Sequence, residues 1–200
     1  MPKPNLRAAF LEAGYETIHR DGYTASGVAA IAARAGGPKG SFYNHFASKE
    51  DLAVAVLERY GDGRRMDMLS AEEHTPLDRI AGHFAHLLAD LAIDDYQRGC
   101  MFGNFAAETA GTNDRLARVV DQAFGEWHEA LAGAIEAARA DGSVDDSVDA
   151  RDAAWFIIDA WEGAALRAKS LRSAAPLERV LALTFSTVLI AGLAPGSTSA

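Results

Sequence analysis

The sequence predicts an all-helical protein in which a small N-terminal domain precedes a larger helical domain. Three observations support this fold class. The 200 residues are rich in Ala and Leu, no stretch shows the alternation of period two that a strand needs, and residues that start and stop helices recur along the chain. Apolar residues make up 49% and charged residues 24% of the sequence, values typical of a globular protein. This length suits one domain or two small ones.

The first three expected helices lie close together in the sequence. The first covers 5–19 and ends shortly before Gly22. The second covers 26–34, a tight Ala-Gly-Gly-Pro break covers 35–38, and the third helix covers 39–45. Two short helices joined by a glycine-containing turn are typical of a helix-turn-helix.

Six more helices are expected after this region, which makes about nine in all. Ser48 suits an N-cap followed by an acidic first turn, and Pro76, directly after Thr75, suits the first position of the following helix. Apolar residues between 116 and 138 step by three and four, which indicates one buried helical stripe. The six helices are expected at about 48–65, 75–93, 101–110, 113–140, 149–171 and 176–193.

The stretch 24–52, TASGVAAIAARAGGPKGSFYNHFASKEDL, carries the most specific pattern in the chain. Ala32 is small where two helices must cross closely, and Gly36 stands where the turn needs a positive φ. A small shared core is expected from four apolar residues, Val28, Ile31, Phe42 and Phe46.

This stretch resembles the DNA-binding domain of TetR-family transcriptional regulators. The resemblance implies a helix-turn-helix DNA-binding domain at 1–47 and a ligand-binding and dimerisation domain at 48–200. Two positions depart from the family pattern: Gly37 stands where an apolar residue such as Val is usual, and Pro38 where Ser is common. The residues that carry the resemblance are Gly22-Tyr23-Thr24, Ile31-Ala32, Ala35-Gly36, Lys39-Gly40-Ser41-Phe42-Tyr43, His45-Phe46 and Ser48-Lys49-Glu50.

The resemblance also implies which residues touch double-stranded operator DNA. Taken singly, each is as easily an idle surface group, but phosphate contacts supply most protein–DNA hydrogen bonds. Phosphate contacts are implied for Lys39, Tyr43, His45 and Lys49, further backbone contacts for Thr24 and Ser26, and an approach to base edges for Gly40, Ser41 and Asn44.

The distribution of charge is consistent with a DNA-binding N-terminal region. The whole chain has a formal net charge of −9. Residues 1–50 hold six basic and four acidic side chains, a net +2, while the remaining residues hold 13 basic and 24 acidic side chains, a net −11. A mildly basic region beside a strongly acidic body favours a site-specific binder over a protein that coats DNA.

A homodimer on a palindromic operator is expected, because one motif reads few base pairs; its recognition helices would stand about 34 Å apart, or a multiple of that. The last two helices are the expected interface, since both are apolar on wide faces. The alternative is that these faces form an ordinary monomer core. The residues concerned are Ala153, Ala154, Ile157, Trp161, Ala164, Ala165 and Ala168, with Val180, Leu181, Leu183, Phe185, Val188 and Leu189.

The segment 98–108, RGCMFGNFAAE, together with Trp161–Lys169 and Pro176–Glu178, resembles a branch of the family that includes NemR-like sensors of electrophiles. Cys100 precedes a helix and follows Arg98, two features that increase the thiolate character of a cysteine. The alternative is a small buried hydrophobic residue. Independently of the thiol, an effector pocket is expected among the central helices, lined by Cys100, His83, Leu87, Met101, Asn104, Phe105, Phe124, Trp127 and Trp161.

Other function classes find less support in the sequence. His83 and His86 are three residues apart, but no metal-ligand motif such as HExxH occurs, and neither does a GxSxG or phosphate-binding loop. We therefore expect no enzyme, no metal and no cofactor. A helical protein-interaction module would explain the apolar C-terminal helices but not the 39–49 pattern. One cysteine, no signal peptide and no membrane span indicate a cytoplasmic protein.

Overall fold

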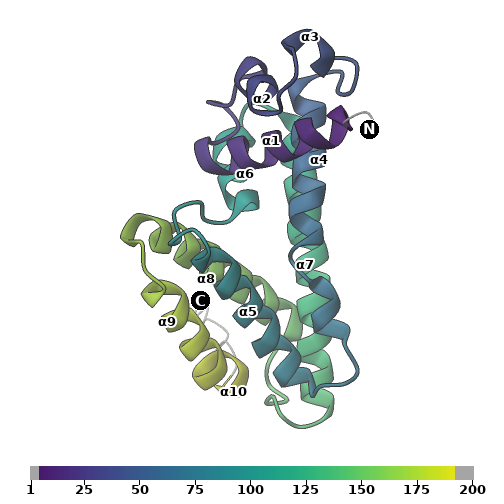
Figure 1. Ribbon diagram of the computed structural model, residues 1–200. Helices are drawn as coiled ribbons and strands as arrows, with labels where there is room; N and C mark the ends of the chain where they lie inside the picture. The colour runs from purple at the N-terminus through teal and green to yellow at the C-terminus, as the bar shows by residue number, and fades with distance from the viewer. Residues whose placement is uncertain (1–4, 192–200) are drawn as a thin grey trace, which may run out of the picture. The chain divides into compact units, whose positions relative to one another are not determined.

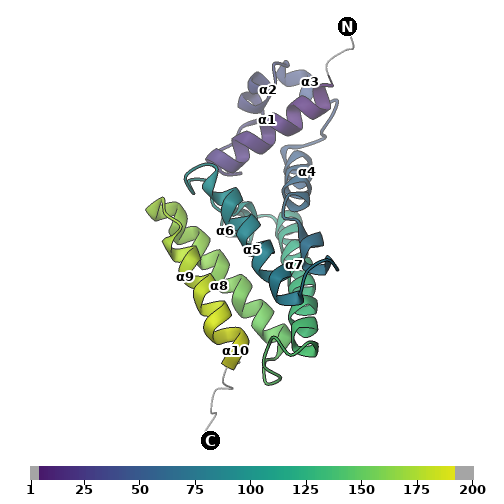
Figure 2. The same cartoon turned by 60° about the horizontal axis from the view of Figure 1, so that its bottom comes forward.

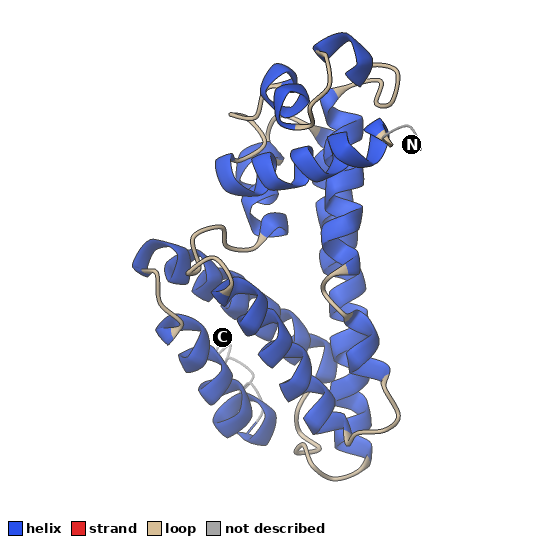
Figure 3. Ribbon diagram, in the orientation of Figure 1, coloured by secondary structure: helices blue, strands red, loops and turns tan. Residues whose placement is uncertain are grey.

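The computed structural model describes residues 5–191, and that part of the chain holds helices and loops but no strand (Figure 3). The prediction of an all-helical fold is confirmed. The helices are α1 (Leu6–Asp21), α2 (Val28–Arg34), α3 (Lys39–Phe42), α4 (Lys49–Asp62), the 3₁₀ helix η1 (Met66–Ser70), α5 (Pro76–Ala92), α6 (Met101–Thr109), α7 (Asp114–Ala140), α8 (Ala150–Leu171), α9 (Ala175–Leu183), the π-helical turn η2 (Thr184–Val188) and α10 (Leu189–Ala191).

Several helices begin at side-chain caps, two of which, Ser48 and Thr75, lie where the sequence predicts a helix start. The side chain of Asn5 accepts a hydrogen bond from the Ala8 N–H at 3.2 Å. Ser48 Oγ accepts one from the Asp51 N–H at 3.0 Å, and Thr75 caps α5 in the same way with proline in its first turn. Each cap satisfies an N–H that has no partner within its helix.

The helix ends differ from the expected ones at three places. α4 stops at Asp62, because Arg65 adopts a left-handed conformation with φ 54° and the chain then turns into η1. α3 has only four residues and stops at Phe42. The last helix is interrupted by η2, and its expected end at 193 lies outside the described residues.

The described chain divides into two compact units. The first contains residues 5–63 and 100–123, so that α6 and the first ten residues of α7 belong to the same unit as α1–α4. In this unit α1, α2 and α3 gather around the start of α4 (Figure 1). The expected domain boundary after residue 47 stays a prediction, because it concerns function rather than compactness. The core of the first unit includes Phe10, Ile18, Ile31, Phe42, Leu52, Val56, Tyr60, Phe105 and Leu116.

The second unit contains residues 64–99 and 124–191 and is built from α5, the rest of α7, α8 and α9. α8 and α9 run side by side in both views (Figures 1 and 2). No helix in the described part of the chain is long and apolar enough to cross a membrane. The core of this unit includes Ile80, Phe84, Trp127, Leu131, Ile135, Ile157, Trp161 and Leu177.

The apolar stripe of α8 that was expected to pair with a second copy lies inside the single chain. Its seven residues, from Ala153 to Ala168, are at most 5% exposed. They therefore form monomer core, and the expectation that they supply the dimer surface is wrong. α8 packs this stripe against other helices of its own chain, among them α9. An apolar helix face is stabilised by any apolar surface that covers it, and helices of the same chain do so here. Of the residues expected at the interface on the last helix, Val188 and Leu189 are also buried, whereas Leu183 is exposed. The other large apolar side chains exposed on the last helices are Trp155, Phe156, Leu166, Leu171 and Ile190.

Candidate functional site

The turn between α2 and α3 has the glycine conformation that the sequence predicts. Gly36 adopts φ 70°, a left-handed conformation that other residues adopt at a cost. Gly37 is explained by packing, because a Cβ at this position would lie 3.1 Å from Cζ of Phe10. Phe10 is fully buried and meets Phe42 edge to face, with ring centroids 5.5 Å apart. Phe10 thus fills the space beside the turn that a larger side chain at 37 would need.

The expected shared core of the helix-turn-helix is present. Ile31 and Phe42 are fully buried and Phe46 is 4% exposed, while Val28 is half-buried at the start of α2. The rings of Phe42 and Phe46 lie 5.7 Å apart. This packing fixes how α3 is held against α2, which decides the residues that α3 presents to solvent.

Four of the expected DNA-contact residues are exposed on α3 and just after it. Lys39, Gly40, Tyr43 and Asn44 all face solvent, and the Tyr43 side chain is 52% exposed although it is aromatic. Its ring stands edge to face on Phe42 at 5.3 Å, which orients the ring while leaving the phenol accessible. A cation, a phenol, an amide and a bare backbone position are groups that bind phosphates and base edges.

Three other expected contact residues have side chains that are partly or fully engaged within the chain. Ser26 is 2% exposed, and its hydroxyl donates to the Gly22 carbonyl at 2.6 Å. Ser41 is half-buried, and its hydroxyl donates to the Pro38 carbonyl at 2.8 Å. His45 is half-buried with its ring 5.7 Å from Phe10. Their contact with DNA stays a prediction.

Lys49 is bound to the loop that precedes α2. Its Nζ donates to the Tyr23 carbonyl at 2.7 Å and lies 4.1 Å from the centroid of the Tyr23 ring. Burial lowers the pKa of Lys49, and the negative charge of Glu108 opposes that shift. The ammonium group therefore holds the Tyr23–Thr24 loop, where Thr24 is exposed.

Glu108, near the end of α6, holds the same loop from another side. Its carboxylate accepts hydrogen bonds from the backbone N–H of Thr24 at 2.8 Å and of Tyr23 at 3.3 Å. The Tyr23 ring also packs against Phe105 of α6 at 5.5 Å. The sequence analysis assigned no role to Glu108, and no local pattern shows it, because 84 residues separate it from Thr24.

The start of α7 is bound to the start of α4 by a second cluster. Asn113 Nδ2 donates to Glu50 at 2.6 Å, and Arg115 Nη1 donates to Glu50 at 2.9 Å and to Asp51 at 2.7 Å. The hydrogen bond from Asn113, and then that from Arg115, lower the pKa of Glu50. Hydrogen bonds from Arg115 and Ser48 lower the pKa of Asp51. α6 and α7 thus contact, through side chains, both the loop before α2 and the helix after α3.

Four of the nine expected effector-binding residues lie in this first unit. Cys100 is the N-cap residue of α6 and is half-buried, and Asn104 is half-buried one turn later. Met101 and Phe105 are each 1% exposed and belong to the unit's core. The helix that carries Cys100 is therefore the helix that carries Glu108.

The other five expected effector-binding residues lie in the second unit. His83 is fully buried, Leu87, Trp127 and Trp161 are 2–4% exposed, and Phe124 is half-buried. The ring of His83 meets that of Trp127 edge to face at 5.9 Å. Burial lowers the pKa of His83 to about 4, so that its imidazole is neutral at neutral pH.

Two domain families match the chain. Residues 10–56 match the family described as bacterial regulatory proteins of the tetR family, and residues 76–184 match the tetracyclin repressor-like C-terminal domain. The chain belongs to the TetR family. The resemblance drawn from residues 22–50 is confirmed, and the second match extends it over most of the helical body.

Relatives match this TetR-family chain over nearly its full length. The transcriptional repressor DhaR of Mycobacterium sp. (strain GP1) is 32% identical over 192 residues, which are 94% of this chain and 95% of DhaR. The crystal structure of reduced NemR from E. coli has a TM-score of 0.80 at 29% identity and covers 96% of this chain and all of its own. A TetR regulatory protein from Rhodobacter sphaeroides has a TM-score of 0.83 at 28% identity, covering 89% and 96% of the two chains.

These matches establish the general function. The chain is a TetR-family transcriptional regulator with an N-terminal helix-turn-helix DNA-binding domain, and DhaR and NemR are both named repressors. The predicted similarity to NemR is confirmed for the chain as a whole. The named relatives are transcriptional regulators, which do not work as enzymes.

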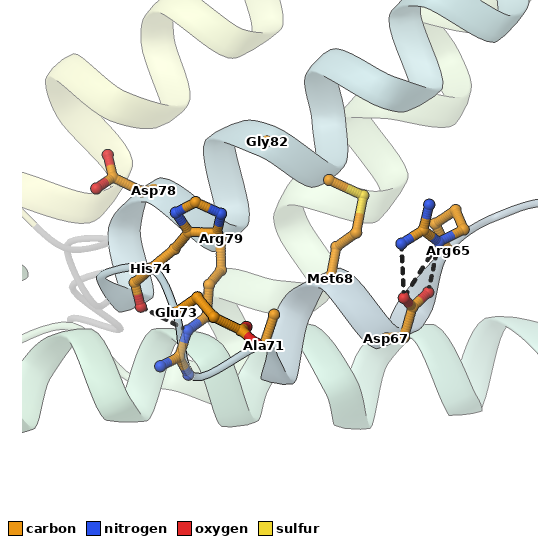
Figure 4. A pocket seen from close by; sticks show the side chains of 9 residues that line it. All are labelled: Arg65, Asp67, Met68, Ala71, Glu73, His74, Asp78, Arg79 and Gly82. Carbon is orange, nitrogen blue, oxygen red and sulfur yellow. Dashed lines mark hydrogen bonds and ion pairs between the residues drawn. The ribbon is translucent and has the colours of Figure 1, made fainter.

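A surface pocket of about 480 Å³ opens in the second unit of this TetR-family protein between η1 and α5 (Figure 4). None of its lining residues was expected in the effector pocket. Two of its cations are bound within the lining: Arg65 bonds to Asp67 at 2.8 Å, and Arg79 Nε donates to the His74 backbone carbonyl at 2.9 Å. The lining residues are Arg65, Asp67, Met68, Ala71, Glu73, His74, Asp78, Arg79 and Gly82.

Residues 5–191 contain no candidate metal site, because no group of three or more His, Cys, Asp or Glu side chains there is placed to hold an ion. The candidate site of this TetR-family chain has two parts. One is the surface of α2 and α3, held by α4, α6 and α7, and the other is the buried cluster of His83, Trp127 and Trp161 in the second unit.

Proposed function

We propose that the protein is a repressor that binds a palindromic operator as a homodimer and releases it when a small molecule occupies the helical body. The observation that carries this proposal is the set of exposed residues on α3 and on the two residues after it: Lys39, Tyr43 and Asn44, held on a rigid aromatic core. Family membership supplies operator DNA, dimers and small-molecule effectors as the general partners.

The roles of the DNA-binding residues follow from their exposure. Lys39 and Tyr43 bind phosphates, since both reach solvent from the recognition helix and its C-cap. Asn44 reads a base edge. Gly40 lets the backbone of α3 approach the groove closely, because it has no side chain and the space beside it is open. Thr24, Ser41 and His45 add contacts at the edges of this surface.

In place of the direct DNA contacts expected from the resemblance, Ser26 and Lys49 act by positioning the loop before α2. Both bind backbone carbonyls of the loop before α2, at Gly22 and Tyr23. They hold Thr24 and the N-terminus of α2 in the conformation that meets the DNA backbone.

The dimer forms through the outward faces of the last two helices. Four large apolar side chains there are 45–67% exposed: Phe156 and Leu166 of α8, Leu183 of α9 and Ile190 of α10. Exposed large apolar side chains favour a partner surface, and two-fold pairing of these helices would bury them.

The effector shifts a population between a form that fits DNA and one that does not. Ligand in the second unit tilts α4 and changes the spacing of the two recognition helices. Cys100 offers a second route, in which a small electrophile alkylates the thiol and moves α6, the helix whose Glu108 holds the loop before α2. A Cys100→Ser variant that responds to electrophiles like the wild type would refute this route and leave Cys100 as a packing residue.

Operator binding in a gel shift with full-length dimeric protein tests the proposal. We expect Lys39→Ala/Tyr43→Ala to dimerise normally and to release the operator, with the slope of log affinity against log salt falling by about 0.9 for each phosphate that the variant no longer binds. Arg118→Ala, which removes an exposed charge on α7, is the matched control and keeps both affinity and slope. Wild-type affinity of the double variant would refute the proposed surface.

A further inference from the structure

The core of the second unit contains three ring nitrogens without a hydrogen-bond partner among the described residues. They are Nδ1 and Nε2 of His83 and Nε1 of Trp127. His83 is fully buried and Trp127 is 4% exposed. A buried donor or acceptor left without a partner costs about 1–3 kcal/mol, so native proteins keep few of them.

These nitrogens come from two neighbouring rings, not from scattered positions. The centroids of His83 and Trp127 are 5.9 Å apart, with the rings 65° from parallel. The two rings are therefore in direct contact, and their three unpartnered nitrogens form one polar spot within an apolar core.

The surroundings of the pair are aromatic. Phe84 lies 5.4 Å from His83 and 5.9 Å from Trp127, and it also meets Trp161 at 5.1 Å. Aromatic walls with a few convergent polar groups are typical of a site for a small organic molecule.

The cluster provides hydrogen-bond donors rather than a positive charge. The indole N–H is a donor only, and a neutral imidazole adds one donor and one acceptor. Burial keeps His83 neutral; the backbone carbonyl of Arg65 opposes this but makes no hydrogen bond of normal geometry with either ring nitrogen. The nearby guanidinium of Arg64 is 8% exposed and pairs with Asp90 at 2.7 Å. A carboxylate brought here would therefore meet a neutral imidazole and an already paired guanidinium, which makes its desolvation costly.

We propose that His83 and Trp127 receive the oxygen of a small neutral effector, a ketone, aldehyde or alcohol, and that the site discriminates against carboxylates. This inference rests on the proposed function, since it names the chemical class of the molecule that releases the operator. The Trp127 indole and the His83 N–H donate to the effector's oxygen, and Phe84 and Trp161 pack on its carbon skeleton. Non-covalent binding here needs no reaction with Cys100.

The test compares three probes of similar size on the full-length protein by titration calorimetry at pH 7. Cyclohexanone carries a neutral acceptor, methylenecyclohexane is its isostere without the oxygen, and cyclohexanecarboxylate carries an anion. We expect cyclohexanone to bind about tenfold more tightly than methylenecyclohexane, because a hydrogen bond to a buried donor contributes about that factor. Equal affinities, preference for the carboxylate, or no binding of cyclohexanone at millimolar concentration would each overturn the proposal.

Two variants assign the preference to the two rings. Trp127→Phe keeps an aromatic ring without the N–H, and we expect it to weaken cyclohexanone binding about tenfold while changing methylenecyclohexane less than twofold. His83→Phe acts in the same direction through a different side chain, so the conclusion does not depend on one variant folding. Trp155→Phe, on the exposed face of α8, is the matched control and keeps the wild-type preference. Retention of the preference in both core variants would refute the assignment.

A separate gel shift distinguishes this inference from the proposed function. Cyclohexanone binding with the expected preference, in a protein whose operator complex is unaffected by the ketone, would support the site and refute release by its occupant. Dissociation from the operator without measurable ketone binding would refute the site and leave the repressor function standing.

Discussion

Replacing Glu108 with Gln removes a negative charge from two backbone N–H groups of the loop before α2 while keeping the shape of the side chain. The carboxylate accepts from Thr24 at 2.8 Å and from Tyr23 at 3.3 Å. Gln has one oxygen, so it can accept from one of these groups and turns its own NH₂ donors toward the other. The Lys49 ammonium is also deprived of the charge that favours its protonated form.

The magnitude follows from the kind of hydrogen bond that the substitution removes. A bond to a charged group contributes about 1.5–3 kcal/mol and a neutral one about 1 kcal/mol. Because the Tyr23 bond is long and Thr24 is exposed, the lower end applies, and we expect the free energy of unfolding to fall by about 1 kcal/mol. For a protein of this length that corresponds to a Tm about 2–4 °C lower.

Urea unfolding and operator titration measure the two consequences. We expect weaker operator binding at an unchanged salt slope, because Glu108 positions the loop and touches no phosphate. Glu58→Gln, the same substitution at an exposed site of α4 in the same unit, is the control and leaves both quantities unchanged. An unfolding free energy within about 0.3 kcal/mol of the wild type would show that the loop does not depend on Glu108.

Three further predictions concern acid stability and assembly. Because the pKa of His83 is low in the folded state, the unfolded chain takes up a proton at this side chain below about pH 6.5, while the folded chain does so only near pH 4. The free energy of unfolding therefore falls by about 3 kcal/mol as the pH decreases through this window. The urea midpoint of His83→Phe, measured against pH, should lack that decrease. The lowered pKa of Glu50 contributes stability that is present above its unfolded pKa and disappears as the pH falls through the lower folded value. Arg115→Gln should therefore flatten the dependence of the urea midpoint on pH below about pH 5. An unaltered dependence would contradict the pairing of Arg115 with Glu50. Leu166→Glu/Leu183→Glu should yield monomers in sedimentation velocity, since both side chains are more than half exposed on the proposed dimer surface; a stable dimer would place the interface elsewhere.

The local pattern was sufficient to predict most of the fold. Capping by Ser48 and Thr75 and the left-handed Gly36 depend on interactions within a few residues, and all three are as expected. The end of α4 was missed because Arg65 adopts a left-handed conformation that its residue type does not favour. The sequence pattern also predicted that α8 has a broad apolar surface, but it did not show which part of that surface packs against the same chain.

The sequence by itself determined the helical class, the helix-turn-helix and its family, because helix caps, periodicity and the spacing of 22–50 are local properties of the chain. Only the tertiary structure decided which distant groups meet. It placed Glu108 on the loop before α2, put α6 with Cys100 in the compact unit of the DNA-binding helices, and buried His83 beside Trp127. Such contacts depend on how whole helices pack, and packing is fixed by the combined burial of many side chains rather than by any short stretch of sequence.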